Sequence, residues 1–203
     1  MQISKVVSKA EALFAAFNDH FYNGEIATPA ITVHPDGGRG AYGWASVNEI
    51  WSAEDGQYRE LNICAEYLDR PLAEIARTIL HECAHLLNLQ NGIVDTSNNG
   101  YYHNKRFKAT AEAHGLIIEK DAKYGWTITS LTPETEAWIA ATFGEQGMKV
   151  SRMAEAVAGK AGKRKSINRS IKYVCPCCGT SVRATKQVNV VCGDCDEAME
   201  PSL

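Results

Sequence analysis

Apolar residues recur at steps of three and four positions in several stretches of this chain. The pattern predicts a helix over residues 3–22, a second from Pro71 to about residue 88, and two shorter helices that open near His103 and Thr132. Asparagine–glycine pairs follow the first two stretches, and such pairs are typical of the residues that end a helix. The chain is therefore expected to contain four helices.

Short runs rich in β-branched and aromatic residues lie between these helices. Five of them have the composition of strands: residues 30–33, 41–47, 61–64, 117–118 and 126–128. The first two flank a glycine-rich turn at residues 36–40. Because no helix follows those glycines, a hairpin suits them better than a phosphate-binding loop. The resulting order, α-β-β-β-α-loop-α-β-β-α, predicts an α+β domain.

The second predicted helix contains the motif H-E-x-x-H, formed by His81, Glu82 and His85. Residues four apart on a helix differ by about 400° of rotation, so both imidazoles project from nearly the same face. Such a pair can hold one Zn²⁺, and Glu82 then stands where it can take a proton from water. So short a motif also occurs by chance in ordinary helices. Other features of the sequence are therefore needed to support a metal site.

A catalytic zinc usually has three protein ligands. The metzincin pattern needs glycine at position 88 and histidine at position 91, and this chain has asparagine at both. His103 is the best-placed third ligand, because it ends a long polar loop and Phe107 can anchor the helix that follows. Three other residues stay open for this role: Cys64, Glu112 and His114.

Composition and cysteine placement bear on the compartment. The 203-residue chain is 45% hydrophobic, which suffices for one substantial core and a small appendage. It has no run of about 20 apolar residues, so we expect a cytoplasmic protein without a membrane partner. Five of the seven cysteines fall in the last 29 residues, which favours metal binding in a reducing interior over a disulfide framework. Cys64 and Cys83 are predicted core residues.

Cys175, Cys178, Cys192 and Cys195 form two C-x₂-C pairs separated by thirteen residues. Four thiolates in two such pairs suit a structural zinc with no open position, so residues 173–203 are predicted to form a zinc ribbon. Between the pairs, two segments can form a short hairpin: residues 180–183 and 187–191. So small a segment has little core, and its metal should supply the folding energy. Cys177 is the spare thiol, although it can replace Cys175 or Cys178.

The net charge of −3 is unevenly distributed. Residues 1–148 hold 11 Lys and Arg against 19 Asp and Glu, residues 149–172 hold 8 against 1, and residues 173–203 hold 2 against 4. We therefore expect a domain, a basic linker and the ribbon with these boundaries. The linker is a candidate for phosphate contacts, although a solvated spacer has the same composition. The candidate nucleic-acid-binding residues are Lys160, Lys163, Arg164, Lys165 and Arg169.

Residues 10–128 resemble the SprT-like zinc metallopeptidases, the family that includes the DNA–protein crosslink protease Spartan. The resemblance rests on the order of these elements: Leu13-Phe14, Phe17-Asn18 and Phe21 in the first helix, Gly43, His81-Glu82-x-x-His85, and His103 to Phe107. It implies a zincin-like domain in which His81, His85 and His103 bind a catalytic zinc and Glu82 is the base. A C-terminal ribbon is also frequent in that family. The family often has His-Gly at the third ligand, whereas this chain has His103-Asn104.

Together these features predict a zincin-like α+β domain with a small sheet packed on the H-E-x-x-H helix, plus a zinc ribbon. We expect one catalytic and one structural Zn²⁺ in a monomeric endopeptidase that acts on DNA-associated proteins and contacts DNA. One alternative is a DNA-binding zinc protein whose zincin core is structural or regulatory rather than proteolytic. Another is a zinc hydrolase unrelated to DNA. Four residues are open as oxyanion partners: Tyr101, Tyr102, His114 and Tyr124.

Overall fold

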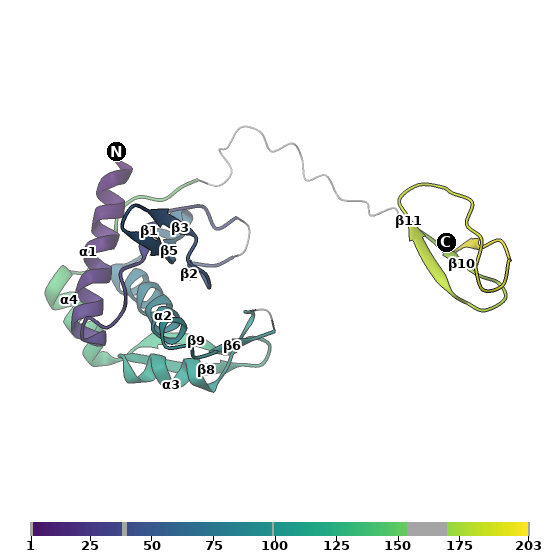
Figure 1. The fold of residues 1–203 in the computed structure, drawn as a ribbon. Helices are drawn as coiled ribbons and strands as arrows, with labels where there is room; N and C mark the ends of the chain where they lie inside the picture. Colours follow the sequence, from purple (N-terminus) through teal and green to yellow (C-terminus); the bar gives the residue numbers. More distant parts are fainter. Residues whose placement is uncertain (1, 38–39, 99, 154–169, 203) are drawn as a thin grey trace. The chain divides into compact units, whose positions relative to one another are not determined.

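The computed structural model describes residues 2–37, 40–98, 100–153 and 170–202 (Figure 1). The chain divides into two compact units, Met1–Ala156 and Val157–Leu203. In its described part, the first unit combines four helices with small sheets, and the second is a small sheet beside a cysteine cluster. The mixed α+β class is therefore confirmed. No helix in the described ranges has the length and apolarity that crossing a membrane requires.

All four predicted helices are present in the first unit. They are α1 (Ile3–Tyr22), α2 (Leu72–Gln90), α3 (Lys105–Ala113) and α4 (Pro133–Phe143). Local sequence explains two of their starts. The Asn104 side chain accepts hydrogen bonds from the Arg106 and Phe107 N–H groups at the start of α3, and the Thr132 hydroxyl accepts one from the Thr135 N–H at the start of α4. These boundaries agree with the periodicity of the apolar residues.

Helix α2 occupies the middle of the first unit (Figure 1). On one side lies the sheet of β1 (Ala30–Thr32), β5 (Glu60–Ile63) and β2 (Gly43–Ala45), and on another lies α3 with β8 (Leu116–Asp121) and β9 (Gly125–Leu131). Its apolar stripe is buried in the core, and the Tyr22 hydroxyl of α1 donates to the Leu80 carbonyl oxygen at 3.0 Å. Burying each such Leu, Ile or Phe side chain contributes about 1.5–3 kcal/mol. The motif helix is thus anchored along its length.

The first sheet contains β1 (Ala30–Thr32), β5 (Glu60–Ile63) and β2 (Gly43–Ala45), in that order. The predicted hairpin between the first two strands is wrong, because β5 lies between them, parallel to β1 and antiparallel to β2. The buried side chain of Asn62 explains the placement. Its Oδ1 accepts from the His34 backbone N–H at 2.7 Å and from the Thr32 hydroxyl at 2.9 Å, which holds β1 to β5.

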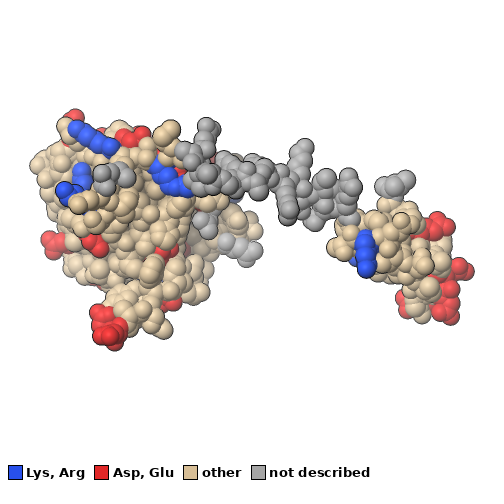
Figure 2. Space-filling view, turned by 90° about the horizontal axis from the view of Figure 1, so that it is seen from above, with Lys and Arg blue, Asp and Glu red and all other residues tan. Residues whose placement is uncertain are grey.

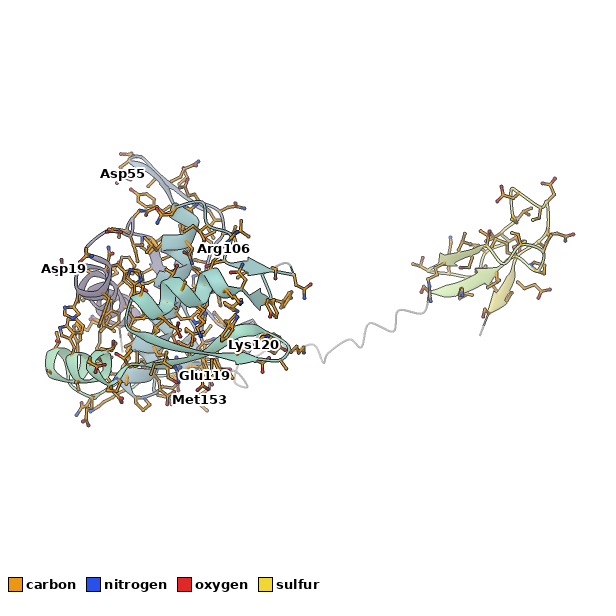
Figure 3. The ribbon with its side chains drawn as sticks, turned by 90° about the horizontal axis from the view of Figure 1, so that it is seen from below. Asp19, Asp55, Arg106, Glu119, Lys120 and Met153 are labelled. Atoms are coloured by element: carbon orange, nitrogen blue, oxygen red, sulfur yellow. The ribbon has the colours of Figure 1, made fainter. Side chains whose placement is uncertain are left out.

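A hairpin that the sequence analysis did not predict joins β3 (Trp51–Ala53) to β4 (Gly56–Tyr58). Its turn projects from the unit at Asp55 (Figure 3). The hairpin is tied to the first sheet by the Glu60 carboxylate, which accepts from the Trp51 indole at 3.2 Å and the Trp44 indole at 3.3 Å. Glu60 is buried, so these donors satisfy a carboxylate that water cannot reach.

The second sheet has the order β6-β7-β9-β8. Its strands are β6 (Thr96–Ser97), β7 (Tyr102–His103), β8 (Leu116–Asp121) and β9 (Gly125–Leu131). The predicted pairing of residues 117–118 with 126–128 is confirmed within the longer antiparallel pair of β8 and β9. Strands β6 and β7 begin within the long polar stretch of residues 91–102, and β7 carries His103, the residue after that stretch, back to the sheet.

Residues beyond α4 pack back onto the first unit. The Met148 N–H donates to the Leu68 carbonyl at 3.2 Å, and the Arg152 N–H donates to the Ala65 carbonyl, at the start of η1 (Ala65–Tyr67), at 2.8 Å. The Arg152 guanidinium also pairs with Glu66 at 2.7 Å. The stretch up to Arg152 therefore lies against the first unit, four residues past the boundary drawn from composition.

The second unit is built on β10 (Ile171–Val174), which pairs with β11 (Ser181–Ala184) and β12 (Glu200–Ser202). The predicted hairpin between residues 180–183 and 187–191 is wrong, because β11 pairs with β10 instead. The reason is packing: Tyr173 of β10 is buried beside Cys175 and Cys192, and its hydroxyl accepts from the Val188 N–H at 3.0 Å. Figure 2 shows acidic side chains gathered at one end of this unit.

Candidate metal centre and its cleft

Three histidines from two parts of the first unit converge. His81 and His85 lie one turn apart on α2, as the motif predicts, and His103 arrives at the end of β7. The Nε2 atoms of His85 and His103 are 3.1 Å apart, and one ligand atom from each of the three rings lies within 4.8 Å of the others. All three rings pack against Phe107, with centroids 4.5–4.7 Å from its ring.

His103 is positioned mainly by its backbone. Its N–H donates to the Tyr124 carbonyl at 3.0 Å, and its partner in the neighbouring strand is Gly125. Gly125 has φ +77°, and an added Cβ there would collide with the His103 carbonyl oxygen. Only glycine therefore lets β9 approach β7 this closely. Nδ1 of His103 is buried and has no hydrogen-bond partner among the described residues.

The other two rings are oriented by hydrogen bonds at Nδ1. The Thr129 hydroxyl donates its one proton to the Thr127 carbonyl at 3.0 Å, so it accepts from Nδ1–H of His81 at 2.9 Å. The Asp95 carboxylate accepts from Nδ1–H of His85 at 2.7 Å. Both imidazoles then present the Nε2 lone pair, which is the form that binds a metal.

Asp95 is itself held by a buried network. Its carboxylate accepts from the side-chain amide of Asn88 at 3.0 Å, and Oδ1 of Asn88 accepts from the Thr110 hydroxyl at 2.7 Å. The Asp95 backbone carbonyl accepts from the N–H of Asn104, the residue after His103, at 2.9 Å. Asp95 thus ties the loop that carries one histidine to the helix that carries another.

Burial and these partners shift the pKa values of the site. Burial, together with the neighbouring histidines, lowers the pKa of His81 well below its ordinary value. Burial also lowers the pKa of His103 to about 4. Burial opposes protonation of His85 as well, but the Asp95 hydrogen bond and charge outweigh it and raise that pKa. Burial raises the pKa of Glu82, against a hydrogen bond from the Ala45 backbone N–H.

Three imidazoles with converging lone pairs suit Zn²⁺, which prefers nitrogen and sulfur ligands in a tetrahedral arrangement and binds at catalytic sites through three protein groups. Neutral histidines are the metal-binding form, and the depressed pKa values of His81 and His103 favour that form. The donor set therefore fits one zinc ion. Glu82, next along the helix and 7% exposed, lies outside this donor group.

The histidines form the floor of a cleft of about 920 Å³. One wall is the edge strand β2 with the flanking residues Tyr42 and Val47, and another is β9 around Ile128. Strand β2 lies tightly on α2 because Gly43 has no side chain. A Cβ there would lie 2.7 Å from the Asn62 carbonyl oxygen and 2.8 Å from the Thr78 methyl group. The cleft is therefore bounded by an exposed strand edge beside Glu82.

The remaining candidates lie elsewhere. His114 stacks on Tyr22, with ring centroids 4.2 Å apart, and Glu112 pairs with Lys108 at 3.4 Å. Cys64 and Cys83 are buried core residues, as expected. None of the four residues left open as oxyanion partners is among the described residues that line the cleft: Tyr101, Tyr102, His114 and Tyr124.

The second unit brings the four predicted cysteines together. One sulfur from each of Cys175, Cys178, Cys192 and Cys195 lies within 4.8 Å of the others, and Cys177 is exposed outside the group. Hydrogen bonds with Thr180 lower the pKa of Cys178 to about 6, which favours the thiolate that binds metal. Four sulfurs at such distances suit a closed tetrahedral zinc site. The five basic candidates, Lys160 to Arg169, lie outside the described residues.

Sequence reasoning missed the residues that orient the histidines. Asp95 appeared only as one polar residue of a long loop, and Thr129 had no local pattern to mark it. Asn88 is one residue whose position in the sequence indicates a buried polar network. This amide occupies an inward position of α2 and is 1% exposed, and a buried amide needs hydrogen-bond partners. Its partners are Asp95 and Thr110.

We expect Asp95→Ala to weaken zinc binding to the first unit by about 10- to 100-fold, because loss of a carboxylate behind a ligand histidine has effects of that size. Asp95→Asn keeps an acceptor for His85 and should lose less. Competition with a chromophoric chelator measures both. Glu112→Ala, an exposed acid on α3, is the matched control, and an Asp95→Ala affinity within twofold of wild type would contradict the assigned role.

Comparison with known proteins adds one finding. The family model described as the SprT-like family matches residues 10–123, more than half of the 203 residues. The matched range contains the three histidines, Glu82 and Asp95. Curated proteins and solved structures yielded no match.

Proposed function

The chain belongs to the SprT-like family, and from this premise we propose that it is a zinc-dependent endopeptidase with a zincin-like catalytic domain. One observation carries the proposal above the rest. His81, His85 and His103 present their ligand atoms within 4.8 Å of one another on the floor of a cleft, with Glu82 alongside. This is the donor set of a catalytic zinc site, which leaves a coordination position for water or substrate.

The roles of the chain's own groups follow from their surroundings. A zinc ion held by the three histidines supplies a Lewis acid that polarises a carbonyl group and acidifies water. Glu82 accepts the proton of the attacking water and returns it to the nitrogen of the leaving amine. Its burial raises its pKa, which brings the carboxyl group closer to the pH at which it can both take and give a proton.

The substrate is proposed to bind as an extended strand. In the pairing of β2 with β5, the Tyr42 carbonyl and the Ser46 N–H bond to β5, so Gly43 and Ala45 present their backbone groups to the open side. That side faces the cleft, where the Ala45 N–H donates to Glu82, so the backbone groups of Gly43 and the Ala45 carbonyl are the ones that can pair with a substrate strand. An exposed edge is a template for one more strand. A protein must therefore be locally unfolded to enter.

We further propose that the substrates are DNA-associated and that the linker provides the DNA contact. Residues 149–172 hold eight Lys and Arg against one Glu, whereas residues 173–203 hold two against four acids. The ribbon by itself is thus a poor phosphate-binding surface. Basic side chains bind nucleic acid by releasing counterions from its phosphates.

Binding of the full chain to single-stranded DNA should therefore weaken steeply with salt. If the five linker residues each neutralise one phosphate, the slope of log K against log salt concentration is about −3.5. Fluorescence anisotropy of a labelled oligonucleotide measures it. Replacing the five residues (Lys160, Lys163, Arg164, Lys165 and Arg169) by glutamine should flatten the slope. An unchanged slope would place the contact elsewhere.

The peptidase proposal is tested by incubating the full zinc-loaded chain with an unfolded protein substrate. New internal N-termini, found by mass spectrometry, are the expected result, and they should vanish when chelator removes the metal and return when zinc is restored. Intact substrate after prolonged incubation with fully loaded protein would overturn the proposal and favour a zinc protein whose first unit is structural.

A further inference from the structure

The two ends of the metal cleft differ in character. Toward the C-terminus of α2 the lining is apolar, with Leu89, Ile93 and Val94. Toward the N-terminus it contains Arg77, the one Lys or Arg among the described residues that line the cleft. The acids of the lining are Glu82 and Asp95, both buried, and Asp95 is engaged by His85. Within the described lining, a cation therefore faces the cleft at the N-terminal end of α2.

The charge of Arg77 is weakly compensated. Its ion-pair partner among the described residues is Glu74, whose carboxylate oxygen is 3.9 Å away and whose side chain is 44% exposed. The same oxygen lies 3.8 Å from the guanidinium of Arg70, so one carboxylate serves two cations. Arg70 in turn stacks on Tyr42, 4.2 Å from its ring centroid, at the edge of the cleft. This end of the cleft is therefore electropositive.

The position of Arg77 relative to the metal site follows from the helix. Arg77 precedes His81 by four residues, so both side chains leave the same face about 6 Å apart along the axis. An extended peptide rises about 3.3 Å per residue. Arg77 thus stands opposite a substrate residue about two positions away from the bond that lies over the histidines.

Strand β2 determines the direction in which a bound substrate strand runs. Successive residues of this segment contact successive positions along the helix chain: Tyr42 contacts Arg70, Gly43 contacts Thr78, and Ala45 contacts Glu82. Strand β2 therefore runs in the same direction as α2. A substrate strand that pairs antiparallel to β2, the more stable arrangement, runs the opposite way. Its C-terminal side then passes Arg77, and its N-terminal side passes the apolar end.

We propose that Arg77 is a specificity-determining residue that selects an acidic substrate side chain about two positions on the C-terminal side of the cleaved bond. This inference rests on the proposed peptidase function and names the chemistry of its substrate. Segments with an acid at that position and apolar residues before the bond are preferred, and segments with lysine there are disfavoured by the like charge.

The test uses three peptides that differ only at this position, with Glu, Gln or Lys. Wild type should cleave the Glu peptide roughly tenfold faster than the Lys peptide, as measured by kcat/KM, because each partly exposed pair changes the rate by a few-fold. Arg77→Gln should remove the preference, and Arg77→Glu should reverse it, at unchanged zinc content. If Arg77 had only a structural role, the Arg77→Glu variant would not cleave the Lys peptide faster than the Glu peptide.

Lys120→Glu is the matched charge reversal, because Lys120 is exposed near the end of β8 and does not line the cleft (Figure 3). It should keep the wild-type preference. Equal cleavage of all three peptides by wild type, or an Arg77→Glu variant that still prefers the Glu peptide, would overturn the role of Arg77. No cleavage of any peptide by zinc-loaded wild type would overturn the peptidase function beneath it.

Discussion

Replacing Glu82 by glutamine is expected to lower kcat/KM for peptide cleavage by roughly 10²- to 10⁴-fold, the usual contribution of a general base. Glutamine has nearly the same shape and can still accept from the Ala45 N–H, so β2 should stay in place. What it lacks is a group that takes a proton from water. A fluorogenic peptide measures the rate, and elemental analysis measures the zinc.

His85→Ala is the complementary variant, since it should lose activity together with zinc from the first unit. The two variants together separate proton transfer from metal binding, because Glu82→Gln should keep its zinc while its kcat/KM falls. A Glu82→Gln protein with wild-type kcat/KM would mean that another group is the base. A Glu82→Gln protein without zinc would mean that Glu82 supports the metal site itself.

The second large effect is expected in the ribbon. Cys178→Ser should leave the second unit unfolded, because structural zinc contributes about 10–16 kcal/mol to small domains of this kind. Among the described residues of this unit, the buried side chains are few: Tyr173, Cys175, Cys192 and Met199. No core of that size replaces the metal. The first unit has its own core and should be unaffected.

Cys177→Ser is the control, since Cys177 is the exposed neighbour of Cys178 and lies outside the four-cysteine group. Amide spectra of the full chain distinguish the two variants, with dispersed ribbon signals for Cys177→Ser and collapsed ones for Cys178→Ser. Equal collapse in both would show that Cys177 contributes a ligand. Dispersed signals in both would show that the ribbon folds without a complete metal site.

The helices could be predicted because their signals are local. Apolar spacing fixes which face is buried, and the caps at Asn104 and Thr132 are single residues with a known preference. Strand partners could not be predicted in the same way. The sequence places β1 and β2 next to each other, but the buried Asn62 side chain binds β1 to a strand 30 residues further on. That pairing depends on contacts distant in sequence.

The candidate site shows the same division. His81 and His85 follow from helical spacing, and His103 follows from its place at the end of a loop before a helix. Asp95 and Thr129 orient two of these rings but come from a loop and a distant strand, where neither periodicity nor spacing marks them. In the ribbon, the cysteine spacing was informative, whereas the strand partner of β11 was decided by the buried Tyr173 of β10.

The central claim is that the histidine site cuts proteins associated with DNA. Its most direct test incubates purified wild type and Glu82→Gln with a basic protein bound to DNA, with and without added single-stranded DNA. We predict fragments of the bound protein with wild type alone and more of them when single-stranded DNA is present. Intact protein in every condition, with zinc fully loaded, would contradict the claim and favour a zinc protein without peptidase activity.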